Sequence, residues 1–259
     1  MRLPAAVRER VAAVHGGAGL SERLRLYDGW AACYEQVPGR RAGRMLRFPP
    51  LPGASDRRVP QDVAALEYRA PHLAAASLAF AFPAPPAEAR LLDVACGTGV
   101  VARELHRRGF RCLHGVDGSA GMLERARSTG LYQELRQCVL GREPLPAPAE
   151  HYDAVTVVGA LGEGQVPSAA VPELLRVTKA GGFLCLTTRS NPSNLRYKAE
   201  LEAVLEELER QGAWQKVLAQ EVERWEKATS EEESTQGTGY ISGVVYVYRK
   251  CPVPPPEEG

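Results

Sequence analysis

A glycine-rich turn between a short apolar run and an amphipathic segment constrains the fold of this chain more than any other feature. The run Leu-Leu-Asp-Val-Ala-Cys-Gly-Thr-Gly occupies residues 91–99. Its first half has the length and apolar character of a buried strand, and helical spacing of apolar residues follows over 100–108. Gly97 and Gly99 allow a tight turn and let a ligand approach the backbone without an intervening side chain. The turn therefore predicts a strand, a ligand-binding loop and a helix in succession.

Strand and helix patterns alternate from residue 90 onwards. The sequence predicts strands over 91–95, 112–116, 138–140, 154–158, 183–188 and 240–248. It predicts helices over 100–108, 119–129 and 169–177, and a long helix from 194 to 227 with a break near Gly212. This alternation is typical of an α/β sheet with crossover helices.

The first 89 residues follow a different pattern. Apolar residues at helical spacing predict helices over 3–14 and 20–35, and again from Asp62 until Pro83. Residues 37–61 hold five prolines and six arginines, a mixture that favours neither helix nor strand. We expect a helical cover over 1–89 with a flexible insertion at 37–61, a main domain over 90–250, and a disordered Pro- and Glu-rich tail over 251–259.

Composition excludes several classes of protein. The formal net charge is +1, so the whole molecule offers no general attraction to nucleic acid or to an anionic membrane. We interpret the basic cluster at residues 40–47 as part of a solvated insertion. No apolar run approaches the roughly 20 residues that cross a bilayer. The six cysteines stand singly, without the paired spacing of a structural zinc site, so we expect reduced thiols and no metal. A monomer in the cytoplasm is expected, and a nuclear location stays open.

Two cofactor classes compete for the glycine-rich turn. Residues 97–102 also fit the G-x-G-x-x-G/A pattern of dinucleotide-binding folds, with Asp117 at a suitable distance for a ribose. Asp93 discriminates between the two classes. A carboxylate beside the loop disfavours a doubly charged pyrophosphate and suits a zwitterionic amino acid that carries an ammonium group. The turn therefore favours a methionine-like ligand.

A second candidate element surrounds Asp117, which ends a predicted parallel strand. Ligands bind open α/β sheets at this edge, and the two oxygens of Asp117 can accept both hydroxyls of a ribose. Met122, on the first turn of the next helix, can lie against an adenine face through its thioether. The structural alternative is that Asp117 caps that helix and Met122 fills the core.

The order of these motifs resembles that of the class I S-adenosylmethionine-dependent methyltransferases. The matching segments are D-V-A-C-G-T-G at 93–99, G-V-D-G-S at 115–119, E-P-L-P at 143–146, Y-D-A-V at 152–155 and K-A-G-G-F-L at 179–184. Flanking segments, among them Y-D-G-W-A-A-C-Y at 27–34 and S-N-L-R-Y-K at 193–198, resemble a mammalian branch of methyltransferase-like proteins. The resemblance implies a Rossmann-like class I methyltransferase fold, with a seven-stranded, mostly parallel sheet, an antiparallel last strand and an N-terminal helical cover.

The resemblance also implies a set of cofactor-binding residues. The cofactor would be S-adenosyl-L-methionine, with S-adenosyl-L-homocysteine as product. Asp93, Ala95, Gly97, Thr98 and Gly99 would line its methionine end, Asp117 would hold the ribose, and Gly118, Met122, Leu140 and Gly141 would border the adenine. Gly159 would lie near the transferred methyl group. Tyr27, Trp30, Tyr34 and Arg69 are the expected contacts from the cover. Leu140 and Gly141 stand where family members often carry an acidic residue, so the polar adenine contact would come from the backbone.

Residues 37–61 also depart from the family pattern, in which residue 36 would lead almost directly to Asp62. We hypothesise that the segment is an in-frame insertion, which would weaken cofactor binding by unseating the cover.

No catalytic residue and no methyl acceptor can be assigned from the sequence. Methyl transfer needs a general base only where the acceptor carries a proton, and His114 and His151 are candidates by residue type alone. Asn191-Pro192 is interpreted as a turn. A non-catalytic protein that binds the same cofactor and a dinucleotide-dependent oxidoreductase stay open as alternative functions.

Overall fold

The computed structural model describes residues 3–15, 19–34, 62–83 and 86–252. One seven-stranded sheet organises them, in the order β3-β2-β1-β4-β5-β7-β6. Its strands are β1 (Arg90–Val94), β2 (Cys112–Asp117), β3 (Tyr132–Gln137), β4 (Tyr152–Leu161), β5 (Thr178–Arg189), β6 (Trp214–Lys227) and β7 (Tyr240–Lys250). The first five run parallel, and β7 is antiparallel to both of its neighbours. The chain therefore has the Rossmann-like class I fold that its motifs imply.

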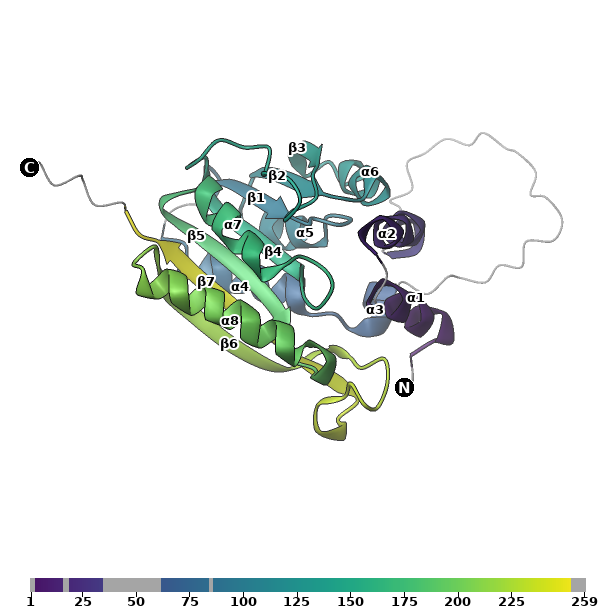
Figure 1. The fold of residues 1–259 in the computed structure, drawn as a ribbon. Coiled ribbons are helices and arrows are strands. Elements are labelled where there is room, and N and C mark those ends of the chain that lie inside the picture. Colours follow the sequence, from purple (N-terminus) through teal and green to yellow (C-terminus); the bar gives the residue numbers. More distant parts are fainter. Residues whose placement is uncertain (1–2, 16–18, 35–61, 84–85, 253–259) are drawn as a thin grey trace, which may run out of the picture.

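Helices cover both faces of this sheet (Figure 1). Helices α4 (Ala70–Ala81) and α5 (Val100–Arg107) pack on one face, where α6 (Ala120–Ser128) also lies against β3. The opposite face is covered by α7 (Val171–Val177) and α8 (Leu195–Arg210). Apolar residues alternate between these two cores along each inner strand, because successive side chains of a strand point to opposite faces.

A third layer closes one end of the sheet. Helices α1 (Ala5–His15), α2 (Leu20–Tyr34) and α3 (Asp62–Leu66) gather beyond the carboxyl ends of the parallel strands (Figure 1). Val7, Val11, Trp30 and Leu66 form their common core. The predicted helices over 3–14 and 20–35 are confirmed to within a few residues, and they lie where a parallel sheet binds its ligands.

Two predicted elements are wrong. The third strand is Tyr132–Gln137 rather than 138–140. This strand lies at the sheet edge and is half exposed, so it lacks the apolar run of an inner strand. The second error concerns residues 214–227, predicted as helix and found as β6. Many of their residue types favour helices, but pairing with β7 supplies their backbone hydrogen bonds, and tertiary context overrides propensity.

The helical segment after Asp62 also differs from its prediction, because it divides into α3 and α4. Glu67 has a left-handed backbone with φ of 53°, which interrupts the helical hydrogen bonds. Pro71 then lies in the first turn of α4, where its missing N–H costs no helical bond. The insertion predicted at 37–61 and residues 253–259 of the predicted tail lie outside the described residues.

Candidate functional site

The predicted cofactor loop connects β1 to α5 and contains three left-handed backbone positions. Ala95, Gly97 and Gly99 have φ of 55°, 55° and 87°. A Cβ on Gly97 would meet no atom within 4 Å, so open space lies above the turn, whereas Thr98 is buried. The left-handed conformation of Ala95 costs about 1–2 kcal/mol. Such strain is typical of loops whose shape serves a ligand.

Asp117, at the end of β2, fixes this loop. One carboxylate oxygen accepts a 2.8 Å hydrogen bond from the Gly97 N–H, and the other accepts one of 2.8 Å from the Ser119 N–H. Burial raises the pKa of Asp117, and these two donors counteract the rise. Ser119, rather than Asp117, is the N-cap of α6, because its hydroxyl oxygen accepts from the Met122 N–H. The carboxylate of Asp117 therefore joins the loops after β1 and β2.

Asp93 lies beneath the loop and is only 1% exposed. Its carboxyl oxygens accept hydrogen bonds from the Tyr132 hydroxyl at 2.7 Å and the Thr156 hydroxyl at 3.0 Å. Burial raises its pKa to about 7, although both hydroxyls oppose the rise. Near neutral pH, Asp93 is thus divided between its neutral and charged forms, and a cation near the loop would favour the charged form.

A second rim of the site is formed by the residues that are predicted to border the adenine. Gly118 follows Asp117, and a Cβ there would come within 2.9 Å of Leu24 Cδ2, so α2 reaches this rim. Met122 is buried on α6. Leu140 and Gly141 line a cavity of about 400 Å³ that also includes Arg23 and Val139. The structure therefore brings the predicted adenine rim and α2 together.

An aspartate that sequence reasoning missed holds α2 in this position. Asp28 Oδ1 accepts hydrogen bonds from the Gly121 N–H at 2.9 Å and from the Ser119 hydroxyl. A carboxylate beside the first turn of α6 also interacts favourably with the helix dipole. The sequence carries no signal for this contact, because an exposed aspartate on a helix looks like any solvated residue.

The four predicted cover residues divide between different environments. Trp30 packs within the helical cover, where it stacks on Tyr27 and meets the edge of Tyr34. Burial raises the pKa of Tyr27 to about 12 and raises that of Tyr34 further. Arg69 turns towards β6 and donates to the Arg224 carbonyl at 3.0 Å. Among these four, the structure brings Tyr27 and Tyr34 near the site and directs Arg69 away from the loop.

A cavity of about 280 Å³ opens beside Gly159, at the carboxyl end of β4. The helix α1, the ends of β5 and β6, and the segments that follow β4 and β5 supply most of its wall. Gly159 has φ of 76°, and a Cβ at this position would collide with the Tyr68 hydroxyl. Only a glycine therefore allows Tyr68 to lie over the end of β4. The sequence did not predict Tyr68 or this cavity, because local sequence patterns do not indicate which distant segments come together.

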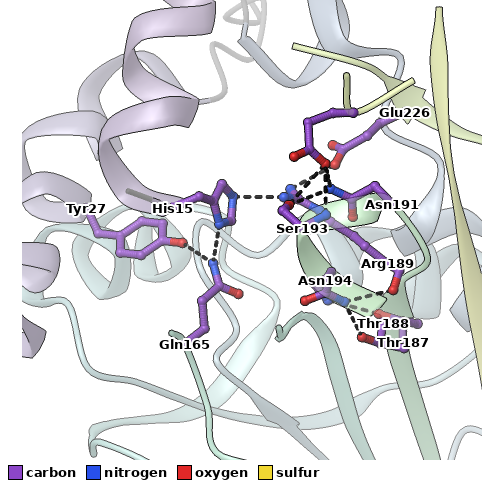
Figure 2. A network of polar contacts seen from close by, with 12 residues as sticks. His15, Tyr27, Gln165, Thr187, Thr188, Arg189, Asn191, Ser193, Asn194 and Glu226 are labelled. Carbon is purple, nitrogen blue, oxygen red and sulfur yellow. Dashed lines mark hydrogen bonds and ion pairs between the residues drawn. The ribbon is translucent and has the colours of Figure 1, made fainter. Parts of the chain in front are cut away.

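A chain of polar side chains crosses this region from α2 to β6 (Figure 2). The Gln165 amide nitrogen lies 3.1 Å from the Tyr27 hydroxyl and 3.3 Å from His15 Nδ1. On the other side of the ring, Arg189 lies 3.0 Å from His15 Nε2 and 2.8 Å from the Glu226 carboxylate.

His15 is neutral in this chain of contacts. Arginine can only donate, so Nε2 of His15 must accept, which requires an unprotonated imidazole nitrogen. Burial, Arg189 and Arg23 all hold the pKa of His15 well below its usual range. The chain of contacts thus ties α1 and α2 to the strands beneath them.

The two histidines proposed as bases from residue type lie elsewhere. His114 contacts the Tyr152 hydroxyl at 3.2 Å, and His151 contacts Arg90 at 3.1 Å. Tyr152 and Arg90 begin their strands, so both histidines lie towards the edge opposite Gly159. Neither reaches the site. Within the described ranges, no group of three or more His, Cys, Asp or Glu side chains gathers where it could hold a metal ion.

The region of the predicted turn after β5 contributes to the cavity. Pro192–Asn194 forms a single helical turn, as expected for Asn191-Pro192. Asn191 and Asn194 line the cavity, and Asn194 Nδ2 donates to the Thr188 hydroxyl and the Arg189 carbonyl. The turn therefore shapes the wall beside Arg189.

Comparisons with known proteins agree with this geometry. The family model described as "Methyltransferase domain" matches residues 91–182. Methyltransferase-like protein 27 of Homo sapiens is 51% identical over 218 residues, which make up 84% of this chain and 78% of that protein.

Two solved structures share the fold. One is a candidate methyltransferase of Bacillus halodurans, with a TM-score of 0.50, 17% identity, and coverage of 69% of this chain and 99% of that one. The other is the [4+2]-cyclase SpnF, with a TM-score of 0.51, 19% identity, and coverage of 76% and 85%. The glycine-rich loop, the strand order and the long match to a methyltransferase-like protein lead to one conclusion: this chain belongs to the class I methyltransferase family.

Proposed function

We propose that this protein is an S-adenosylmethionine-dependent methyltransferase that closes its N-terminal helices over the cofactor. The observation that carries the proposal is that two carboxylates lie against the glycine-rich loop. Asp117 accepts a 2.8 Å hydrogen bond from the Gly97 N–H, and Asp93 lies buried beneath the same turn. The family match supports methyl transfer.

The residues present fit this cofactor. The open space above Gly97 admits a ligand against the backbone. In the proposed arrangement, Ala95, Gly97, Thr98 and Gly99 form the floor under the methionine part, and Asp93 supplies negative charge beneath its ammonium group. The Asp117 carboxylate accepts hydrogen bonds from the ribose hydroxyls. Gly118, Met122, Leu140 and Gly141 border the adenine. Tyr27 and Tyr34 close the site from α2.

Gly159 and the cavity beside it form the proposed acceptor side. When bound, the cofactor supplies a methyl group on a positively charged sulfur. The protein's own contribution is to align the acceptor and exclude water, since methyl transfer is an in-line displacement. Tyr68 covers Gly159, and α1 closes the outer wall of the cavity. A pre-formed enclosure of this kind holds an acceptor at a defined distance from the loop.

Binding is tested with the full chain by isothermal calorimetry and thermal unfolding. S-adenosylhomocysteine is expected to bind and to raise the melting temperature, because a ligand that binds only the folded state stabilises it. Asp117→Asn is expected to weaken this binding by at least about tenfold, since one charged acceptor is lost. Asp153→Asn is the control, since Asp153 pairs with Lys179 away from the loop. Stabilisation by NAD instead of S-adenosylhomocysteine would support the oxidoreductase and contradict the proposal.

Transfer is tested separately from binding. The [4+2]-cyclase SpnF has the same fold, so the fold alone does not establish methyl transfer. Labelled methyl groups from S-adenosylmethionine are expected to appear in an acceptor from a cell extract. Tight binding of S-adenosylhomocysteine without any labelled product would favour the non-catalytic alternative.

A further inference from the structure

We propose that the methyl acceptor is a small molecule with an amine N–H group, which occupies the cavity beside Gly159. The inference rests on the proposed function, because it assigns a substrate class to the acceptor side of that site. It is carried by the charges of the cavity wall and by an unused hydrogen-bond acceptor within it.

The wall carries more negative charge than positive. Glu163, Glu226 and Glu233 line the cavity, as do the cations Arg189 and Lys227. Each cation already lies against a carboxylate. Arg189 pairs with Glu226 at 2.8 Å, and Lys227 pairs with Glu67. His15, the remaining titratable group of the wall that can carry positive charge, is held neutral by burial and by Arg189.

Glu233 is a carboxylate of the wall that accepts its hydrogen bonds from uncharged groups. Its Oε2 accepts from the Asn191 amide and from both the hydroxyl and the N–H of Ser193. These donors position the carboxylate without cancelling its charge. An anionic acceptor would be repelled by this wall, whereas a group that becomes positively charged is stabilised.

Asn191 provides the independent observation. Its side chain lines the cavity and is only 6% exposed, and its Oδ1 has no hydrogen-bond partner among the described residues. Leaving a buried oxygen unpaired is unfavourable, so such atoms in a cavity wall indicate a missing donor. The Asn191 amide, Arg189 and Glu226 lie close together in this wall (Figure 2). An amine N–H supplies the donor that the protein lacks.

The charge change of the reaction fits the same wall. A neutral amine nitrogen uses its lone pair to form the new N–C bond, and the electrons of the broken C–S bond stay on sulfur. The positive charge therefore passes from sulfur to nitrogen, and the methylated ammonium releases its proton to solvent. Fixed carboxylates beside the nitrogen stabilise charge that develops there during transfer. The volume of about 280 Å³ lies close to the lower end of the range for small-molecule pockets.

The first experiment identifies the class of the acceptor. The full chain is incubated with methyl-labelled S-adenosylmethionine and the small-molecule fraction of a cell extract. In one arm, the extract is first acylated with N-hydroxysuccinimidyl acetate and then treated with hydroxylamine, which restores phenols but leaves amides intact. We expect labelled small molecules in the untreated arm and their loss in the acylated arm.

Other outcomes overturn the inference in distinguishable ways. Label that persists after acylation would show that the acceptor is not an amine with an N–H, while methyl transfer itself would stand. Label confined to macromolecules would refute a small acceptor. No label in any fraction, despite S-adenosylhomocysteine binding, would refute both transfer and this inference.

The second experiment tests the wall with charge-removing variants. Glu233→Gln is expected to lower kcat/KM for the labelled acceptor by about tenfold. Glu226→Gln is expected to lower it by about 100-fold, because this change also leaves the positive charge of Arg189 uncompensated in the wall. The affinity for S-adenosylhomocysteine should stay within about twofold, because neither residue belongs to the cofactor loop. Glu221→Gln is the control, since Glu221 is an exposed residue of β6 and does not line the cavity.

Glu233→Gln keeps the experiment decisive if Glu226→Gln leaves Arg189 unpaired and fails to fold. Glu233 is held by neutral groups at the surface, so its replacement removes charge without breaking an ion pair. A Glu233→Gln protein that methylates the acceptor at the wild-type rate would contradict the proposed role of the wall.

Discussion

Asp93 shows how burial sets the charge of a single residue. Its carboxyl is almost inaccessible to water, and its pKa is raised to about 7 by that burial. The unfolded chain ionises the same group near its ordinary value of 3.8. Between these two values the folded state holds more protons than the unfolded state, so stability falls as pH rises.

The pH dependence can be measured against Asp93→Asn. From pH 5.5 to pH 8.5, the wild type should lose about 2 kcal/mol more unfolding free energy than Asp93→Asn, which has no carboxyl to ionise. Urea unfolding at the two pH values gives both numbers. Parallel curves for the two proteins would show that the Asp93 carboxyl does not titrate in this range.

Gly159 allows a second prediction for a single residue. Gly159→Ala places a side chain at φ of 76° and against the Tyr68 hydroxyl, and should destabilise the protein by about 2 kcal/mol or more. Gly97→Ala has a similar backbone conformation but open space, so it should cost only about 1 kcal/mol. Thermal unfolding compares the two.

Tyr68→Phe separates backbone strain from collision. The double variant Gly159→Ala with Tyr68→Phe lacks the colliding hydroxyl, so it should recover part of the stability that Gly159→Ala loses. If the second substitution brings no recovery, the cost of Gly159→Ala comes from the backbone alone.

One carboxylate of helix α2 joins it directly to α6. Asp28 joins α2 to the start of α6 through Ser119 and Gly121. Asp28→Ala should loosen the helix and weaken the binding of S-adenosylhomocysteine by about tenfold, because two hydrogen bonds of about 1 kcal/mol each are lost. Calorimetry measures the change.

Glu22→Ala provides the matched control for this helix, because Glu22 is also an exposed acidic residue of α2. It should leave the affinity unchanged. Equal losses in both variants would indicate that general charge, rather than the contact of Asp28 with α6, governs cofactor binding.

The ion pair between the half-buried Arg189 and the buried Glu226 acts on the molecule as a whole, since it joins β5 and β6 and contacts α1 through His15. Arg189→Met would leave the Glu226 carboxylate buried without a cation, which should cost about 3–5 kcal/mol at pH 8. Burial already raises the pKa of Glu226, and Arg189 opposes that rise.

Without Arg189, the pKa of Glu226 should rise further, so the loss should be smaller at pH 5 than at pH 8. Urea unfolding at both pH values measures this difference. The control is Arg249→Met, because Arg249 is an exposed residue near the end of β7. A loss that is the same at both pH values would contradict an unpaired Glu226 as its cause.

The segment at 37–61 also concerns the whole molecule, and the hypothesis that it weakens cofactor binding stays a prediction. A chain that joins residue 36 directly to Asp62 should bind S-adenosylhomocysteine more tightly than the full chain. Calorimetry on both proteins tests this, and equal affinities would refute it.

No helix among the described residues has the length and apolar character to cross a membrane.

The sequence by itself determined the four inner parallel strands, β1, β2, β4 and β5, and the ligand loop. Local signals suffice there, because a short apolar run followed by closely spaced glycines permits few backbone structures. The loop of Asp93, Gly97 and Gly99 and the strand end at Asp117 could therefore be predicted from neighbouring residues alone.

Only the tertiary structure decided the edges of the sheet and the acceptor side of the site. Residues 214–227 have helical propensity yet form β6, because β7 offers them a partner for every second backbone group. His15, Tyr68, Arg189 and Glu226 come from four distant segments, and nothing in their local sequence records that they meet. Their proximity follows from packing of the cover against the strand ends, and such long-range contacts depend on the whole fold.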